Sequence, residues 1–269
     1  MSGNDTGREM IDTGSGIPIV LIPGLQGRWE WMRPTVAALA KHHRVITFSL
    51  CDERTSPFPC DPKKAFENYV DQVDLALDRA GIDRAIIAGV SYGGLIASEF
   101  AARRPRRVAG LVLASAVHHT WRPDMRQLRF LRAPRLLLPL FLATAPGRMN
   151  PELAAAMPRI SDRLRFKARQ GAYIALAPAS PSRMARRIAW ATAHRYAEPH
   201  RVQAPALVVT GEPALDLILP VDVTRRYLDD LDSAQHIVLK HTGHLGSVTR
   251  PDEFAAVLGR FVDGIRRAA

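Results

Sequence analysis

The stretch at residues 86–100 reads IIAGVSYGGLIASEF, and it places a serine where an apolar, strand-like run changes into an Ala-rich helical run. Its centre, GVSYG at residues 89–93, has the pattern G-x-S-x-G. Glycines on both sides of the serine allow a tight turn and close packing of the following helix on the strand. Such a serine either fills space or is a nucleophile presented beside the positive end of a helix. The strand before it and the helix after it favour a nucleophile.

The chain around this motif alternates short apolar runs with helical stretches. The predicted strands are residues 17–23, 44–50, 84–90, 107–116, 204–211 and 234–241. The predicted helices are residues 29–41, a stretch that begins at 61, 93–105, 221–231 and 251–267. Nearly continuous apolar strands separated by helices are typical of an α/β protein, with a mostly parallel sheet and helices on both of its faces.

The alternation stops between the fourth and fifth predicted strands. Residues 117–203 contain only Arg-, Leu-, Ala- and Pro-rich helical pieces, so we predict a helical insertion there and a core domain from residues 1–116 and 204–269. The insertion holds 16 Arg and Lys against 4 Asp and Glu, whereas the remainder is balanced at 21 against 22. A solvated basic face explains this charge, and weak attraction to an anionic surface is the alternative. No nucleic-acid binding module accompanies it, so we expect no nucleic-acid partner.

The composition is that of an ordinary globular protein, with 47% hydrophobic and 23% charged residues. No apolar run reaches the roughly 18–20 residues that span a bilayer, and the N-terminal stretch lacks the apolar segment of a signal peptide. We therefore expect a cytoplasmic protein, in which Cys51 and Cys60 are interpreted as free thiols. No cluster has the spacing of zinc ligands, so we expect no metal.

A serine hydroxyl needs a base to become nucleophilic near neutral pH. His244 is the candidate base because it follows the last predicted strand, at the sheet edge where catalytic groups of parallel sheets gather. His241 reaches the same edge but lies nearer the strand, and we interpret it as structural. Asp216, after the fifth predicted strand, is the candidate acid that orients the imidazole. Glu212 is the alternative in that loop, and Asp222 is interpreted as a charge at a helix N-terminus.

The chain order Ser91, Asp216, His244 resembles that of the α/β-hydrolase fold superfamily, in which each member of the triad ends a different strand. The segments IVLIPGLQGRWEWM, GVSYGG, PALVVTGEPALDLILP and GHLGSVTRPDEF look like its oxyanion loop, nucleophile elbow, acid loop and histidine loop. Asp216 stands four residues before a proline and His244 seven before another, as is common in that family. The resemblance covers essentially the whole chain outside the insertion, and it implies a serine hydrolase with a helical cap.

The resemblance also implies the rest of the site. Its oxyanion hole would use the backbone N–H groups of Leu25 and Tyr92. The sequence departs from the family at residues 23–24, where Pro-Gly replaces His-Gly, and at residues 51–60, where CDERTSPFPC replaces a Gly-rich loop. The first departure leaves a backbone donor intact, whereas the second leaves one wall of the pocket undefined. The candidate substrate-binding side chains, which could instead face solvent or form the core of the cap, are Gln26, Trp121, Tyr173 and Trp190.

The sequence thus predicts a carboxylic ester hydrolase that acts through an acyl-enzyme on a small-molecule ester of small to medium acyl chain, without a cofactor. Serine at the elbow argues against haloalkane dehalogenases and epoxide hydrolases, which use aspartate there. Lactonase, thioesterase, carbon–carbon bond hydrolase, cofactor-free haloperoxidase or perhydrolase and acyltransferase activities stay open on the same triad. A catalytically silent binding protein is the alternative from another class, and the intact triad argues against it. The sequence does not decide the oligomeric state.

Overall fold

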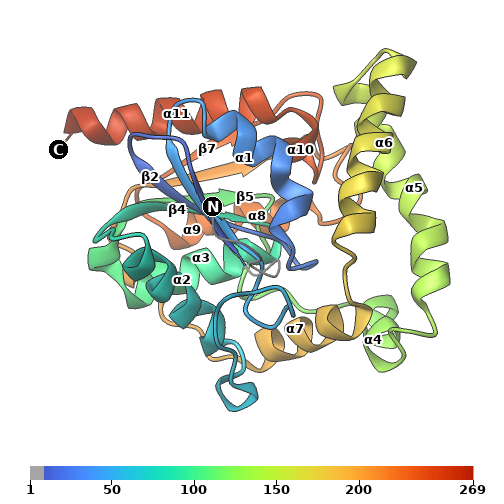
Figure 1. The fold of residues 1–269 in the computed structure, drawn as a ribbon, viewed down its shortest axis with the longest axis horizontal. Coiled ribbons are helices and arrows are strands. Elements are labelled where there is room, and N and C mark those ends of the chain that lie inside the picture. The colour runs from blue at the N-terminus through green and yellow to red at the C-terminus, as the bar shows by residue number, and fades with distance from the viewer. Residues whose placement is uncertain (1–8, 269) are drawn as a thin grey trace, which may run out of the picture.

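A sheet of seven strands forms the centre of the protein (Figure 1). The structure is a computed structural model that describes residues 9–268, apart from the side chains of residues 126, 138, 141, 142 and 268. The strands are β1 (Met10–Thr13), β2 (Pro18–Ile22), β3 (Arg44–Phe48), β4 (Ala85–Val90), β5 (Val108–Ala114), β6 (Ala206–Thr210) and β7 (Ala234–Val238). They lie in the order β1-β3-β2-β4-β5-β6-β7, and all neighbours are parallel except β1 and β3. The predicted α/β class with a mostly parallel sheet is confirmed, and β2 to β7 are the six strands expected.

Each central strand is apolar on both faces because helices cover both sides of the sheet. In β2, Ile19 and Leu21 pack into the core cluster on one face, while Val20 and Ile22 pack into the cluster on the other. The first face is covered by α1 (Arg33–Leu39) and α11 (Pro251–Ala268), and the second by α2 (Glu67–Arg79), α3 (Tyr92–Arg103) and α9 (Tyr227–Asp230). Figure 1 shows α1 and α11 above the sheet and α2 and α3 below it.

Several elements differ from the sequence prediction. Strand β1 was not expected, because four half-buried and exposed residues at a sheet edge carry no apolar pattern. It pairs antiparallel with β3, with Met10 opposite Phe48. The expected helix at 29–41 begins as a 3₁₀ helix (Trp29–Met32) before α1, and the expected helix at 221–231 divides into α8 (Val221–Arg225) and α9. A short helix, α10 (Gly246–Thr249), precedes α11.

Four α-helices lie between β5 and β6 among the described residues. They are α4 (Met125–Arg132), α5 (Leu138–Ala156), α6 (Ile160–Leu176) and α7 (Pro181–Ala193), and we call this segment the cap. Helices α5 and α6 run side by side at the right of Figure 1, where Lys167 Nζ donates to Asn150 Oδ1 at 3.0 Å. Helix α7 packs on the core through buried Ala191, whereas α5 and α6 leave large apolar side chains exposed, among them Leu140, Ile160 and Leu164.

Two expectations from composition concern membrane spans and cysteines. Among the described residues, none of the helices combines the length and the apolar character needed to cross a membrane. Cys51 and Cys60 are free thiols, the first buried and the second half-buried.

Candidate active site

Ser91 stands at a sharp turn between β4, which ends at Val90, and α3, which begins at Tyr92. Its backbone has φ 54° and ψ −118°, a conformation that non-glycine residues adopt only under strain. The turn is tight enough that a Cβ at Gly89 would collide with the carbonyl oxygen of Gly93. A Cβ at Gly93 would in turn collide with the carbonyl oxygen of Ile22. Only glycine fits at either position. These two glycines therefore allow the tight turn that presents Ser91 at the carboxyl end of β4.

The structure brings Ser91 together with His244 and Asp216. Nε2 of His244 lies 3.0 Å from Oγ of Ser91, and its Nδ1 lies 3.3 Å from Oδ2 of Asp216. His244 and Asp216 are buried, at 9% and 6% exposure, while Ser91 keeps partial access to solvent. A hydroxyl, an imidazole and a carboxylate in this series can pass a proton from the hydroxyl to the imidazole and stabilise the resulting imidazolium.

The carboxylate of Asp216 is fixed by its own loop. Its Oδ1 accepts hydrogen bonds from the amides of Ile218 at 3.2 Å and Leu219 at 2.9 Å, which leaves Oδ2 for His244. Glu212, the alternative acid, has a different role in the fold, because its Oε1 accepts from the amide of His241 at 2.8 Å. It braces the loop that carries the histidine, and Asp216 is the carboxylate that faces the imidazole.

The predicted oxyanion loop lies against the nucleophile. A Cβ built at Gly24 would sit 3.4 Å from Cβ of Ser91, which places the neighbouring Leu25 beside the elbow. Among the hydrogen bonds of residues 9–268, none uses the backbone N–H of Leu25 or Tyr92 as donor, so both remain available to a ligand. The side chain of Gln26 is half-buried and folds back toward Gly24.

The aromatic side chains predicted for the pocket make other contacts. Tyr173 faces the guanidinium of Arg33, with Cζ 5.5 Å from the ring centre. Trp190 packs against the core, with its ring 6.0 Å from that of Tyr69 and with Arg186 over its face. Trp121 is half-buried in the turn after β5, where its amide donates to the carbonyl of His118. Their assignment to substrate binding therefore stays a prediction.

Sequence reasoning missed a buried ion cluster beside the predicted oxyanion loop. Arg187 of α7 is completely buried and bonds Oδ1 of Asp52 at 2.7 and 3.0 Å and Oε1 of Glu53 at 2.6 Å. Its Nη1 also donates to the carbonyl of Leu25 at 2.8 Å, so the cap contacts the predicted oxyanion loop directly. Asp52 and Glu53 lie in residues 51–60, the stretch that departs from the family pattern. That departure was the one signal in the sequence that could have pointed to this cluster. A second missed group, the buried Glu152 of α5, lies against the histidine loop.

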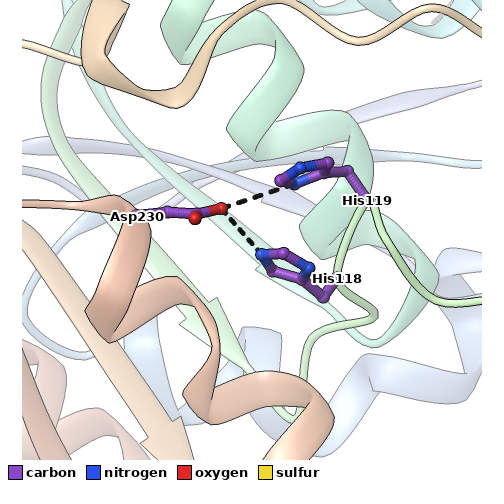
Figure 2. Close-up of side chains that lie close together, drawn as sticks. All are labelled: His118, His119 and Asp230. Carbon is purple, nitrogen blue, oxygen red and sulfur yellow. Dashed lines mark hydrogen bonds and ion pairs between the residues drawn. The ribbon is translucent and has the colours of Figure 1, made fainter.

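His118, His119 and Asp230 form a cluster in which the potential ligand atoms lie within 4.8 Å of one another (Figure 2). Nε2 of His118 and Nδ1 of His119 lie 2.8 and 3.5 Å from Oδ2 of Asp230. The amide and the hydroxyl of Thr120 lie 3.2 and 2.8 Å from Nδ1 of His118, and because the amide can only donate, it favours the neutral tautomer that carries its proton on Nε2, toward Asp230. A metal bound between these groups would need the opposite tautomer of His118. The guanidinium of Arg226, which donates to Thr120 Oγ1 at 3.0 Å, also places positive charge near the cluster. The cluster fits a hydrogen-bonded clamp between the end of β5 and α9 better than a metal site.

Comparison with known proteins places these features in a family. Residues 17–251 match the family model described as the alpha/beta hydrolase fold. The chain is 29% identical to the 2-hydroxymuconate semialdehyde hydrolase of Pseudomonas sp. (strain CF600), over 96% of this chain and 94% of that one. It is 26% identical to the poly(3-hydroxyalkanoate) depolymerase of Ectopseudomonas oleovorans, over 94% and 86% of the two chains. The solved enol-lactonase of Burkholderia xenovorans LB400 shares its fold, with a TM-score of 0.73 at 22% identity over 95% and 96% of the chains. The family and these relatives support a hydrolase activity, and the chain belongs to the alpha/beta hydrolase fold family.

Proposed function

We propose that this protein is a serine hydrolase that cleaves carboxylic esters through an acyl-enzyme. The observation that carries the proposal is the continuous series from Ser91 Oγ to His244 at 3.0 Å and from His244 to Asp216 at 3.3 Å. The strained turn at Ser91, which holds the hydroxyl at the carboxyl end of β4, supports the same assignment.

The mechanism follows from the roles of these groups. His244 takes the proton of Ser91 as the hydroxyl oxygen attacks the ester carbonyl, and Asp216 stabilises the imidazolium through Nδ1. The amides of Leu25 and Tyr92 donate to the oxyanion that forms. His244 then gives its proton to the departing alcohol, and the carbonyl reforms as an acyl-enzyme. A water deprotonated by His244 attacks this acyl group, which releases the acid and returns the proton to Ser91. The residues supply every proton transfer, so the proposal needs no cofactor.

The surface beside the triad favours an uncharged, apolar substrate. Leu217 and Ile218 directly follow Asp216, and 48% and 38% of their surfaces are exposed. The cap arginine that contacts the oxyanion loop, Arg187, is neutralised by Asp52 and Glu53 and has no exposed surface. These observations support an uncharged, apolar substrate over a substrate that needs a buried arginine as counter-ion.

Carbon–carbon bond hydrolysis is the second candidate, favoured by the similarity to the 2-hydroxymuconate semialdehyde hydrolase. Lactone, thioester and acyl-transfer chemistry would use the same triad. Measuring products with competing alcohol or thiol acceptors separates transfer from hydrolysis.

The test is a panel of p-nitrophenyl esters from acetate to palmitate, assayed with the wild type and Ser91→Ala, together with a 2-hydroxymuconate semialdehyde substrate. We expect the fastest turnover on short to medium esters and a loss of at least about 10⁴-fold in the variant. A fluorophosphonate should label Ser91 in the wild type. Ester turnover that survives in Ser91→Ala would refute the mechanism, and preference for the semialdehyde would replace the ester assignment by the second candidate.

A further inference from the structure

Glu152 is a carboxylate of the cap that lies buried against the catalytic loop of the core. It belongs to α5, much of which is exposed, yet only 1% of its own surface is accessible. The other acidic residues of the cap, Asp124, Asp162 and Glu198, are exposed or half-buried. Burying a carboxyl costs free energy unless its oxygens are hydrogen-bonded, so its partners indicate what this position does.

Its partners are residues that closely follow the catalytic histidine. Oε2 of Glu152 accepts the amide of Leu245 at 3.0 Å, and Oε1 lies 3.3 Å from the hydroxyl of Thr249 at the end of α10. The amide of Gly243 also acts on this carboxyl, whose pKa it lowers. Leu245 directly follows His244, so one cap side chain restrains the backbone next to the proposed base.

Burial and hydrogen bonding act in opposite directions on the pKa of the Glu152 carboxyl. The charged or titratable groups that act on Glu152 are His244 and Asp216, and burial, opposed by the two amides, raises its pKa above the ordinary range. The single proton of the Thr249 hydroxyl also has the carbonyl of Leu245 within reach, at 3.1 Å. A protonated Glu152 would donate to Thr249, which could then donate to Leu245, so that every polar atom of the group has a partner.

We propose that Glu152 is a positioning residue that couples seating of the cap to the placement of His244. When α5 rests on α10, the carboxyl fixes the loop that holds the imidazole 3.0 Å from Ser91. Movement of α5 away from the core would withdraw the acceptor of the Leu245 amide and the partner of the Thr249 hydroxyl together. His244 is then held in its catalytic position only while α5 of the cap contacts the core. This inference rests on the proposed function, because it assigns a role relative to the Ser91–His244 pair.

The test compares Glu152→Gln, Glu152→Leu and the exposed-site control Glu198→Leu. The second-order rate of Ser91 labelling by a fluorophosphonate reports the competence of His244 in folded protein, and thermal unfolding checks that each variant is folded. We expect Glu152→Leu to lower the labelling rate and kcat about 10- to 100-fold with KM within about twofold, as for a displaced catalytic group. Glu152→Gln keeps the shape and one acceptor oxygen, and should stay within about threefold of the wild type. Glu198→Leu should match the wild type.

The outcomes separate this inference from the proposed function. A folded Glu152→Leu variant that is labelled at the wild-type rate overturns it, because a purely structural role would change the unfolding temperature alone. If that variant does not fold, Glu152→Asp replaces it, since the shorter side chain withdraws the carboxyl from Leu245. Its labelling should then fall about tenfold, and wild-type labelling in a folded Asp variant overturns the inference. Absence of labelling in the wild type overturns the proposed function and this inference with it.

Discussion

The side chains of Arg187 and Asp52 lie 135 residues apart in the chain, yet both are completely buried and share two hydrogen bonds, of 2.7 and 3.0 Å. Arg187 comes from the cap and Asp52 from the loop after β3, so the pair joins the two parts of the molecule. The same guanidinium donates to the carbonyl of Leu25, whose amide is proposed for the oxyanion hole. Stability and catalysis should therefore both depend on this residue.

Arg187→Met should destabilise the protein strongly. The change removes one partner and leaves Asp52 and Glu53 with buried charge that has lost its main counter-ion, which costs about 3–5 kcal/mol. The free energy of unfolding in urea measures this loss. Ester turnover by the folded fraction should also fall, because the Leu25 loop loses its donor.

Arg186→Met is the matched control. Arg186 also contacts Asp52, at 3.1 Å, but 45% of its side chain is exposed, so its loss should cost no more than about 1 kcal/mol. Similar losses in the two variants would show that burial does not set the strength of this cluster.

Gly89→Ala should disrupt the elbow. The added methyl group would collide with the carbonyl oxygen of Gly93, and overpacking at such a site costs about 1–3 kcal/mol. Gly264→Ala is the control, since nothing lies within 4 Å of a Cβ there and alanine favours the helix. Urea unfolding should show a loss for the first and no loss for the second. An unaffected Gly89→Ala variant would contradict the close approach of strand and helix.

Asp216→Asn should abolish most of the activity and leave the fold intact. An amide group facing Nδ1 of His244 favours the tautomer that carries its proton on Nε2, which can no longer take the proton of Ser91. Such a change lowers kcat by about 10³- to 10⁴-fold. Glu212→Gln is the control, because Glu212 bonds the amide of His241. If the Glu212 variant lost more activity than the Asp216 variant, the assignment of the acid would be wrong.

The parallel strands and the elbow could be predicted because their signals are local. Continuous apolar runs mark strands buried on both faces, and the glycines at 89 and 93 mark the turn between strand and helix. The proximity of Asp216 and His244 to the serine followed from topology, since each comes after a strand whose carboxyl end reaches the same edge. The edge strand β1 escaped prediction because edge pairing to β3 requires no apolar pattern.

The groups that the sequence did not reveal depend on contacts between distant segments. Nothing near Arg187 in the sequence distinguishes it from Arg183 or Arg186, yet only Arg187 is fully buried. Glu152 stands in an apolar helix and meets Leu245 and Thr249, which follow it by 93 and 97 residues along the chain. The contacts of Tyr173 and Trp190 with Arg33 and Tyr69 likewise depend on how the cap lies on the core.

Glu99 of α3 should make stability depend on pH. Its carboxylate is 1% exposed and accepts from Nε2 of His194 at 2.9 Å, the amide of Ala197 at 2.9 Å and Nε of Arg103 at 2.5 Å. Burial alone would raise the pKa of Glu99, but these bonds outweigh it and hold the pKa below the ordinary value of 4.5. The ionised form is thus favoured in the folded protein. Its stabilising contribution is complete above pH 4.5 and is lost as pH falls from there toward the lower pKa of the folded state.

Glu99→Gln should therefore be less stable than the wild type by about 1–3 kcal/mol at pH 6, as expected for loss of charge-assisted hydrogen bonds. Below pH 4.5 the difference should shrink, because the wild type then loses the same charge. Urea unfolding of both proteins at steps between pH 6 and pH 3.5 measures it, with the exposed-site variant Glu198→Gln as a control that should show no such change. A difference that stayed constant across this range would mean that the bonds to His194, Ala197 and Arg103 do not favour the ionised carboxylate.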